Sequence, residues 1–178
     1  MTLRPFGAIS RRGVLKLALG AGGVVAGGVG GVFALRGSAP TVEGLAVLSA
    51  HEYRTMAALA SAAFPDGTLP AGSPSLDLAR AFDTYLADEP RWAQDEAKQA
   101  LFLLELGPLV FERRLATFSH LSPAERVAHF EGWARSSSEL RRQVATGFRK
   151  FLCLLFYDQP AAWTLFGYPG PMISGGAP

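Results

Sequence analysis

The chain has 178 residues, 49% of them hydrophobic, and a formal net charge of +2 that is unevenly distributed. Residues 1–36 contain five basic residues and no acidic one, which leaves 12 basic and 15 acidic residues, a net charge of −3, in the remainder. The body therefore lacks the basic surface that nucleic-acid binding requires. Because Cys153 is the only cysteine, an internal disulfide, a paired-cysteine zinc site and c-type haem attachment are excluded. The length allows one domain with a short appendage.

Residues 10–16 resemble the signal that directs folded proteins to the twin-arginine export route. That signal usually reads Ser/Thr-Arg-Arg-x-Phe-Leu-Lys, and this chain has Val14 where Phe is common. The residues that match the signal, or replace an apolar position in it, are Ser10, Arg11, Arg12, Val14, Leu15 and Lys16. The uncharged run Leu17–Leu35 follows and contains seven glycines. Its mild hydrophobicity is typical of twin-arginine leaders.

A retained signal anchor is the alternative interpretation of the same run. As a helix, Leu17–Leu35 would be about 28 Å long, close to the roughly 30 Å hydrocarbon core of a bilayer. Three glycines at four-residue spacing would give such a helix a close-packing face: Gly23, Gly27 and Gly31. The tripeptide Val32–Ala34 is compatible with cleavage by a signal peptidase. Cleavage and retention therefore both stay open.

Composition divides the chain into four parts. They are a twin-arginine signal or signal-anchor segment (1–36), a linker (37–44), a helical bundle domain (45–168) and a flexible C-terminal tail (169–178).

The first half of the bundle domain contains two predicted helices. Ser49 and Glu52 form a capping box, which predicts a helix that runs towards Phe64. The segment 65–75 is rich in Gly and Pro and predicts a loop. Apolar residues at helical spacing then predict a second helix over about 76–87.

Three more helices are predicted in the second half. Pro90 suits the first turn of a helix, because its missing N–H costs little there. The pair Gly107–Pro108 predicts that this helix ends or kinks. Ser122–Glu125 combines a cap, a first-turn proline and a capping glutamate, and Ser136–Glu139 begins a further helix.

The last long helix is predicted to be amphipathic. Its apolar stripe consists of Leu140, Val144, Phe148, Phe151, Leu152 and Leu155. Its opposite side carries Arg141, Arg142, Arg149 and Lys150. No alternating strand pattern accompanies these helices. The sequence therefore predicts an all-α fold, an irregular bundle of five or six helices preceded by an N-terminal signal or anchor helix.

No catalytic constellation is recognisable in the sequence. His129 follows Glu125 by four residues, which could place two metal ligands on one helix face, but no further ligands cluster nearby. We therefore interpret this pair as an exposed helix pair. His51 is expected at the surface of a first helical turn, and His120 in a loop. Cys153 lies among apolar residues and is expected to be buried and inert.

The segment Phe156–Pro171 is unusually aromatic. Asp158 is a candidate cap for a short turn, and Gly167 permits a tight turn. Four aromatic residues are candidates for a partner interface: Tyr157, Trp163, Phe166 and Tyr168. Alternatively, they cover the core of their own bundle, an interpretation that we favour for Phe166 and Trp163.

The chain resembles the family of gluconate 2-dehydrogenase small subunits, often called "subunit 3". The resemblance rests on the leader arginines Arg11–Arg12 and on three segments, Leu48–Pro65, Leu121–Ser136 and Tyr157–Pro171. The last segment, YDQPAAWTLFGYPGP, is the most specific. The aromatic C-terminal motif of the family maps to Tyr157, Trp163, Gly167, Tyr168, Pro169 and Gly170.

The resemblance implies an accessory subunit without catalytic residues, cofactor or metal of its own. Such subunits bind a large FAD-dependent dehydrogenase of the glucose-methanol-choline class, often together with a multihaem cytochrome c. This subunit is expected to escort its partner, already folded, through the twin-arginine translocation machinery to the periplasm or the outer face of the cytoplasmic membrane. The alternatives are a membrane-anchored structural protein of the cell envelope and, less favoured, a stand-alone metal-dependent enzyme using His129 and Glu125.

Overall fold

A computed structural model describes residues 37–39, 41–65 and 76–170 of the chain. Six α-helices occur in this part. Their bounds are α3 (Ala50–Ala63), α4 (Leu78–Ala87), α5 (Arg91–Glu112), α6 (Pro123–Ala134), α7 (Glu139–Asp158) and α8 (Pro160–Trp163). Two 3₁₀ turns accompany them, η1 (Phe118–His120) and η2 (Thr164–Phe166), and the described residues include no strand. The prediction of an all-α fold is therefore confirmed, whereas the predicted signal or anchor helix and the export-signal residues lie outside the described ranges.

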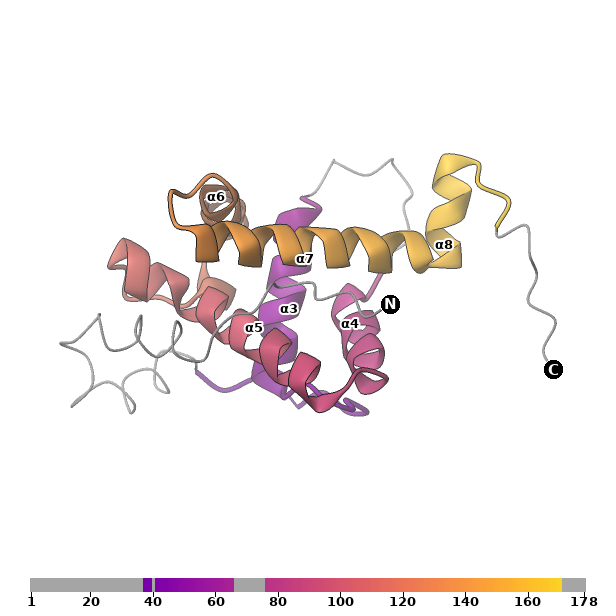
Figure 1. Ribbon diagram of the computed structural model, residues 1–178, viewed down its shortest axis with the longest axis horizontal. Helices are drawn as coiled ribbons and strands as arrows, with labels where there is room; N and C mark the ends of the chain where they lie inside the picture. Colours follow the sequence, from indigo (N-terminus) through magenta and orange to yellow (C-terminus); the bar gives the residue numbers. More distant parts are fainter. Residues whose placement is uncertain (1–36, 40, 66–75, 171–178) are drawn as a thin grey trace.

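Helix α3 lies at the centre of the bundle and contacts α4, α5, α6 and α7. The long helix α7 runs across it, and α8 turns away from the C-terminal end of α7 (Figure 1). Within the part of the chain that the structure describes, no helix is both long and apolar enough to cross a membrane.

Local capping determines where several helices begin. Ser49 and Glu52 form the predicted capping box of α3, and Ser122 and Glu125 form that of α6. The prediction for Pro90 is off by one residue, because Pro90 precedes α5 in an extended conformation and serves as its N-cap. The two capping boxes satisfy backbone N–H groups that have no partner within the helix.

Helix α5 continues through Gly107–Pro108 to Glu112, so of the two predicted outcomes, an end or a kink, the end is wrong. A proline inside a helix removes one backbone hydrogen bond, and here tertiary packing compensates for that loss. Gly107 is buried against α6, and a Cβ atom at this position would lie 2.7 Å from both His129 Nε2 and Trp133 Cζ2. The glycine therefore leaves the space that the rings of His129 and Trp133 occupy against the backbone of α5.

The apolar stripe of α7 faces the core as predicted, with Leu140 only partly buried at its start. Aromatic rings dominate the packing between α4 and α7. The Phe82 ring centroid lies 6.3 Å from that of Phe148 and 5.8 Å from that of Phe151, both in edge-on geometry. Edge-on ring pairs add to the free energy that burial of their area provides.

Two buried carboxylates fix irregular segments to the helices. Asp83 on α4 is 2% exposed and accepts hydrogen bonds from the backbone N–H groups of Ala46 (2.7 Å), Val47 (3.0 Å) and Leu48 (2.7 Å). This arrangement satisfies three donors that no secondary structure pairs.

Glu105 on α5 plays the same role for η1. It is 1% exposed and accepts hydrogen bonds from Ser119 N–H (3.0 Å), Ser119 Oγ (2.7 Å) and Thr55 Oγ1 (3.2 Å). Glu105 therefore joins α5 to both η1 and α3.

The predicted linker 37–44 contacts the body where the structure describes it. Arg54 Nη1 donates to the carbonyl of Ser38 (3.1 Å), and Arg80 donates to the carbonyls of Glu43 (3.1 Å) and Gly44 (3.4 Å). The segment is thus attached to α3 and α4 rather than free.

Candidate partner-binding surface at the C-terminal end of α7

The aromatic segment forms a compact extension of the bundle. Helix α7 ends at Asp158, and the extended backbone of Gln159 (φ −79°, ψ 120°) turns the chain into α8. Asp158 is therefore the last residue of α7, and the prediction that it caps the following turn is wrong, since Gln159 takes that position. Gly167 adopts a left-handed conformation (φ 65°) after η2, as the predicted tight turn requires.

Trp163 holds this extension together. Its indole Nε1–H donates to the carbonyl of Tyr157 (2.7 Å), and the backbone N–H of Tyr168 donates to the carbonyl of Trp163 (3.0 Å). The ring of Trp163 stands edge-on to that of Tyr168, with centroids 5.7 Å apart. A Cβ atom at Gly170 (φ 104°) would lie 3.2 Å from the Trp163 ring. The half-buried indole is thus the centre of the extension.

Phe156 connects the extension to the core. Its buried ring stacks on Phe64 with centroids 5.0 Å apart and meets Phe166 edge-on at 6.3 Å. Phe166 also contacts Tyr157, at 5.4 Å between centroids. Phe166 nevertheless remains 51% exposed. Phe166 therefore packs against a core residue on one side and is exposed on the other, and Trp163 is half-buried.

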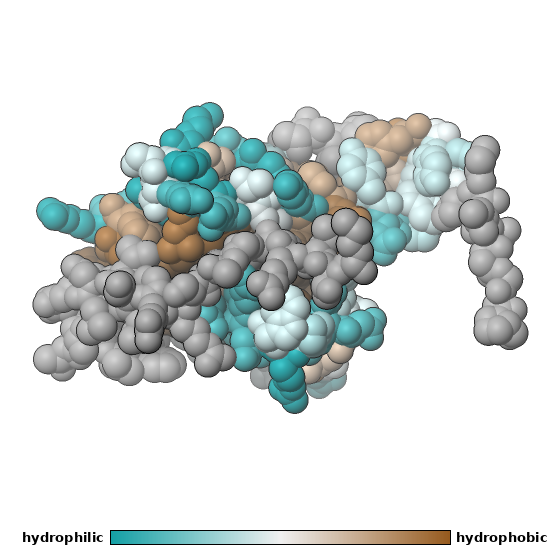
Figure 2. Space-filling model, in the orientation of Figure 1, coloured by the Kyte–Doolittle hydropathy of each residue, from teal (hydrophilic) through white to brown (hydrophobic). Residues whose placement is uncertain are grey.

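We define the C-terminal aromatic surface as the exposed apolar residues of this region. Its members are Leu154 (55% exposed), Tyr157 (57%), Phe166 (51%) and Tyr168 (49%). Leu154 was missed by the sequence analysis, although its three-residue spacing from Tyr157 places both on one side of α7. Figure 2 shows brown and pale atoms gathered over the end of the molecule where α8 lies. A grouped apolar surface of this kind is typical of interaction sites.

The predicted surface pair of His129 and Glu125 does not form. His129 is 4% exposed, and its Nδ1 lies 2.5 Å from Oε1 of Glu112 on α5. Glu125 instead pairs with Arg114. Spacing along the sequence indicated a partner on the same helix, but the burial of this face of α6 against α5 gives His129 a partner that is distant in the sequence.

The surroundings of His129 favour its neutral form. Burial lowers the pKa of the imidazole, and the nearby Arg141 and Arg114 lower it further, against the opposite effect of Glu112. Nε2 has no hydrogen-bond partner among the described residues and faces Gly107. A proton on Nε2 would therefore be buried without an acceptor, which agrees with the lowered pKa.

Glu125, unlike the buried His129, is partly exposed, and the pKa of its carboxyl group is strongly lowered. The hydrogen bond from Arg114, together with those from the backbone N–H and the hydroxyl of Ser122, lowers the pKa of Glu125 to about 2. This carboxylate is therefore ionised in its role as a capping residue at neutral pH.

The other residues considered for chemistry are scattered. Cys153, expected to be buried, is only half-buried, because it lies at the edge of the α7 stripe. His51 is half-buried rather than exposed, with Nδ1 3.2 Å from Nη2 of Arg54, and His120 is exposed in η1. Within residues 37–39, 41–65 and 76–170, no three His, Cys, Asp or Glu side chains lie close enough together to hold a metal ion.

Comparison with protein-family models, with curated proteins and with solved structures gives no match for this chain.

Proposed function

We propose that this chain is an accessory subunit that binds a large FAD-dependent dehydrogenase of the glucose-methanol-choline class and escorts it through the twin-arginine export route. The resemblance of the leader and of three further segments to gluconate 2-dehydrogenase small subunits supports the class. On this proposal FAD belongs to the partner, as does haem c where a cytochrome is present. The complex functions in the periplasm or at the outer face of the cytoplasmic membrane.

The chemistry of the partner explains why export of a folded complex would be needed. A flavoprotein must fold around its cofactor in order to retain it. A route that carries folded proteins is therefore required, and the leader of one chain can serve two chains that have bound each other beforehand. The twin arginines at positions 11 and 12 provide such a leader.

The observation that carries the proposal is the C-terminal aromatic surface. Three exposed aromatic rings and Leu154 lie on a scaffold that Trp163 and Phe156 hold in place. Tyr and other aromatic residues are enriched at the centres of protein interfaces, where a few side chains provide most of the binding free energy. A rigid aromatic surface loses little conformational entropy when a partner covers it.

The first test concerns binding. The chain is co-expressed with a large FAD-dependent dehydrogenase of the proposed class from the same organism, and the complex is isolated through an affinity tag on this chain. We expect Tyr157→Ala and Phe166→Ala each to weaken the complex by about 30-fold or more, as for interface residues that contribute about 2 kcal/mol. Leu115→Ala is the matched control, since Leu115 is 83% exposed and lies outside the surface. Equal binding by all three variants would refute this site for the interface.

The second test concerns export. Replacing Arg11 and Arg12 by Lys should leave both this chain and the flavoprotein in the cytoplasm, since one leader is proposed to serve both. Fractionation followed by dehydrogenase assay of each compartment measures this. If the flavoprotein still reaches the outer side while this chain does not, the escort role is wrong, even if the two proteins bind.

A further inference from the structure

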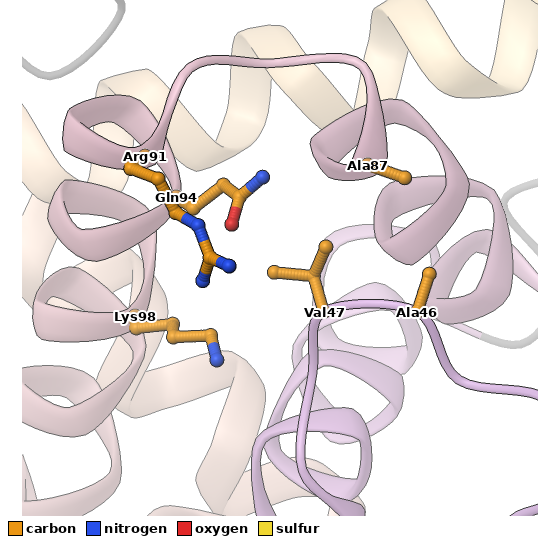
Figure 3. Close-up of a pocket in the computed structure, with 6 residues that line it drawn as sticks. All are labelled: Ala46, Val47, Ala87, Arg91, Gln94 and Lys98. Atoms are coloured by element: carbon orange, nitrogen blue, oxygen red, sulfur yellow. The ribbon is translucent and has the colours of Figure 1, made fainter.

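A cavity of about 350 Å³ lies between the start of the body and the corner that joins α4 to α5. Its walls are Ala46, Val47, Ala87, Arg91, Gln94 and Lys98. Figure 3 shows the side chains of Arg91, Gln94 and Lys98 reaching from α5 towards Val47 on the opposite side. The volume is at the small end of the range for ligand sites, and this lining is more polar than is usual for them.

The amide of Gln94 has a fixed orientation. Its Nε2 donates both hydrogens, one to the carbonyl of Leu86 (3.0 Å) and one to the carbonyl of Glu89 (2.9 Å). Since carbonyl oxygens only accept hydrogen bonds, the opposite amide orientation would place an oxygen against two oxygens. Oε1 is therefore left as an acceptor, and it points to the side of Arg91 and the cavity (Figure 3).

Two cationic side chains face the same space. Arg91 has no hydrogen bond or ion pair with any residue in the described part of the chain. Lys98 Nζ lies 3.7 Å from Oε2 of Glu52, which also accepts hydrogen bonds from the backbone N–H (2.7 Å) and the hydroxyl (2.8 Å) of Ser49. Glu52 is thus shared between its capping role and Lys98, and it leaves the positive charge in the cavity only partly neutralised.

We propose that this cavity binds hydrogen phosphate. A dianion matches the two cations, since Arg91 and Lys98 supply several N–H donors for anionic oxygens. The P–O–H group of hydrogen phosphate can donate a hydrogen bond to Oε1 of Gln94, which can only accept one. Sulfate at neutral pH has the same charge and size but no hydrogen, so one of its oxygens would face Oε1 with nothing to donate. The site is distinct from the C-terminal aromatic surface and does not depend on the proposed function.

The test measures phosphate binding to the purified full-length chain at neutral pH. Equilibrium dialysis with radiolabelled inorganic phosphate gives the affinity, and unlabelled sulfate and methyl phosphate are the competitors. We expect saturable binding of one phosphate per chain, with sulfate weaker by about tenfold or more, because a tenfold change is about 1.4 kcal/mol and the loss of a hydrogen bond to a charged group costs at least about that much. Methyl phosphate, largely without its proton at this pH, should compete as poorly as sulfate.

Variants locate the site. Arg91→Gln and Lys98→Gln should each weaken phosphate binding by about tenfold or more. Lys150→Gln is the matched control, since Lys150 is an exposed cation on α7 that is not among the residues lining the cavity. The proposal is overturned if the chain binds no phosphate, if sulfate competes as well as phosphate, or if Lys150→Gln weakens binding as much as Arg91→Gln.

Discussion

The replacement Asp83→Asn tests how the start of the folded body is fixed. The amide has the shape of the carboxylate but offers one acceptor oxygen in place of two. With the amide oxygen at the position of Oδ1, the hydrogen bonds from Val47 and Leu48 remain, at 3.0 and 2.7 Å in the parent. The amide nitrogen then faces the N–H of Ala46, where the parent has a hydrogen bond of 2.7 Å. One acceptor is thereby replaced by a donor that opposes another donor.

The expected loss follows from these contacts. A hydrogen bond to a charged group contributes about 1.5–3 kcal/mol, and the two that remain become neutral and weaker. Removal of a buried charge offsets part of this loss, because the carboxylate no longer has to be kept out of water. We expect a net decrease of about 2–3 kcal/mol in the free energy of unfolding, or about 5–10 °C in Tm for a chain of this length.

Urea unfolding followed by circular dichroism measures the loss, and hydrogen exchange locates it. The amides of Ala46, Val47 and Leu48 should exchange faster in Asp83→Asn, whereas amides in the middle of α7 should change only as far as global stability does. Asp88→Asn is the matched control, an exposed carboxylate at the end of α4. We expect that control to stay within about 0.5 kcal/mol of the parent. Equal stability of the two variants, or unprotected amides at 46–48 in the parent, would refute the reasoning.

Three further predictions concern α5 and α6. Gly107→Ala should lower the urea midpoint, because a Cβ atom 2.7 Å from Nε2 of His129 costs about 1–3 kcal/mol of overpacking, more than the ~1 kcal/mol that Ala gains in helix propensity; a raised midpoint would contradict this. The free energy of unfolding should fall as the pH drops below about 6.5, because the imidazole of His129 binds a proton in the unfolded chain but, with its lowered pKa, not in the folded chain. The variant His129→Asn keeps a donor towards Glu112 but cannot bind this proton. In a pH series its stability should therefore depend less on pH than that of the parent. The pKa of Glu125 is lowered to about 2 in the folded chain, so its contribution to stability is present above about pH 4.5 and is lost as the pH falls towards 2. The difference in Tm between the parent and Glu125→Gln should shrink over that range, and a constant difference would exclude the ionised capping role.

Local signals in the sequence predicted the helices well because their causes are local. A capping box needs only residues three apart, as at Ser49 and Glu52, and the α7 stripe needs only regular spacing. The helix that was expected to end or kink at Gly107–Pro108, and that continues to Glu112, shows the limit of such rules. Its continuation depends on packing against α6, a contact that no neighbouring residue reveals.

The buried polar residues could not be predicted for the same reason. Asp83 and Glu105 resemble ordinary surface carboxylates of amphipathic helices, yet their donors are backbone and hydroxyl groups 14 to 50 residues away. His129 was given the right kind of partner, a glutamate, but from the wrong helix. For the candidate site, the turn at Gly167 was predictable from composition, whereas the half-exposure of Phe166 depends on how far Phe156 fills the core beneath it.

The attachment of residues 37–44 bears on the fate of the leader. Ser38 is already held by Arg54, and a Cβ atom at Gly37 would lie 3.6 Å from Nε2 of His120, so contacts with the body begin directly after Arg36. A peptidase that cuts after Ala34 binds the chain in extended form on both sides of that bond, and it therefore competes with these contacts. If the chain is exported already folded, as we propose, retention of the leader leaves the hydrogen bond between Arg54 and the Ser38 carbonyl undisturbed, whereas a peptidase that draws this segment into its own binding site works against that bond.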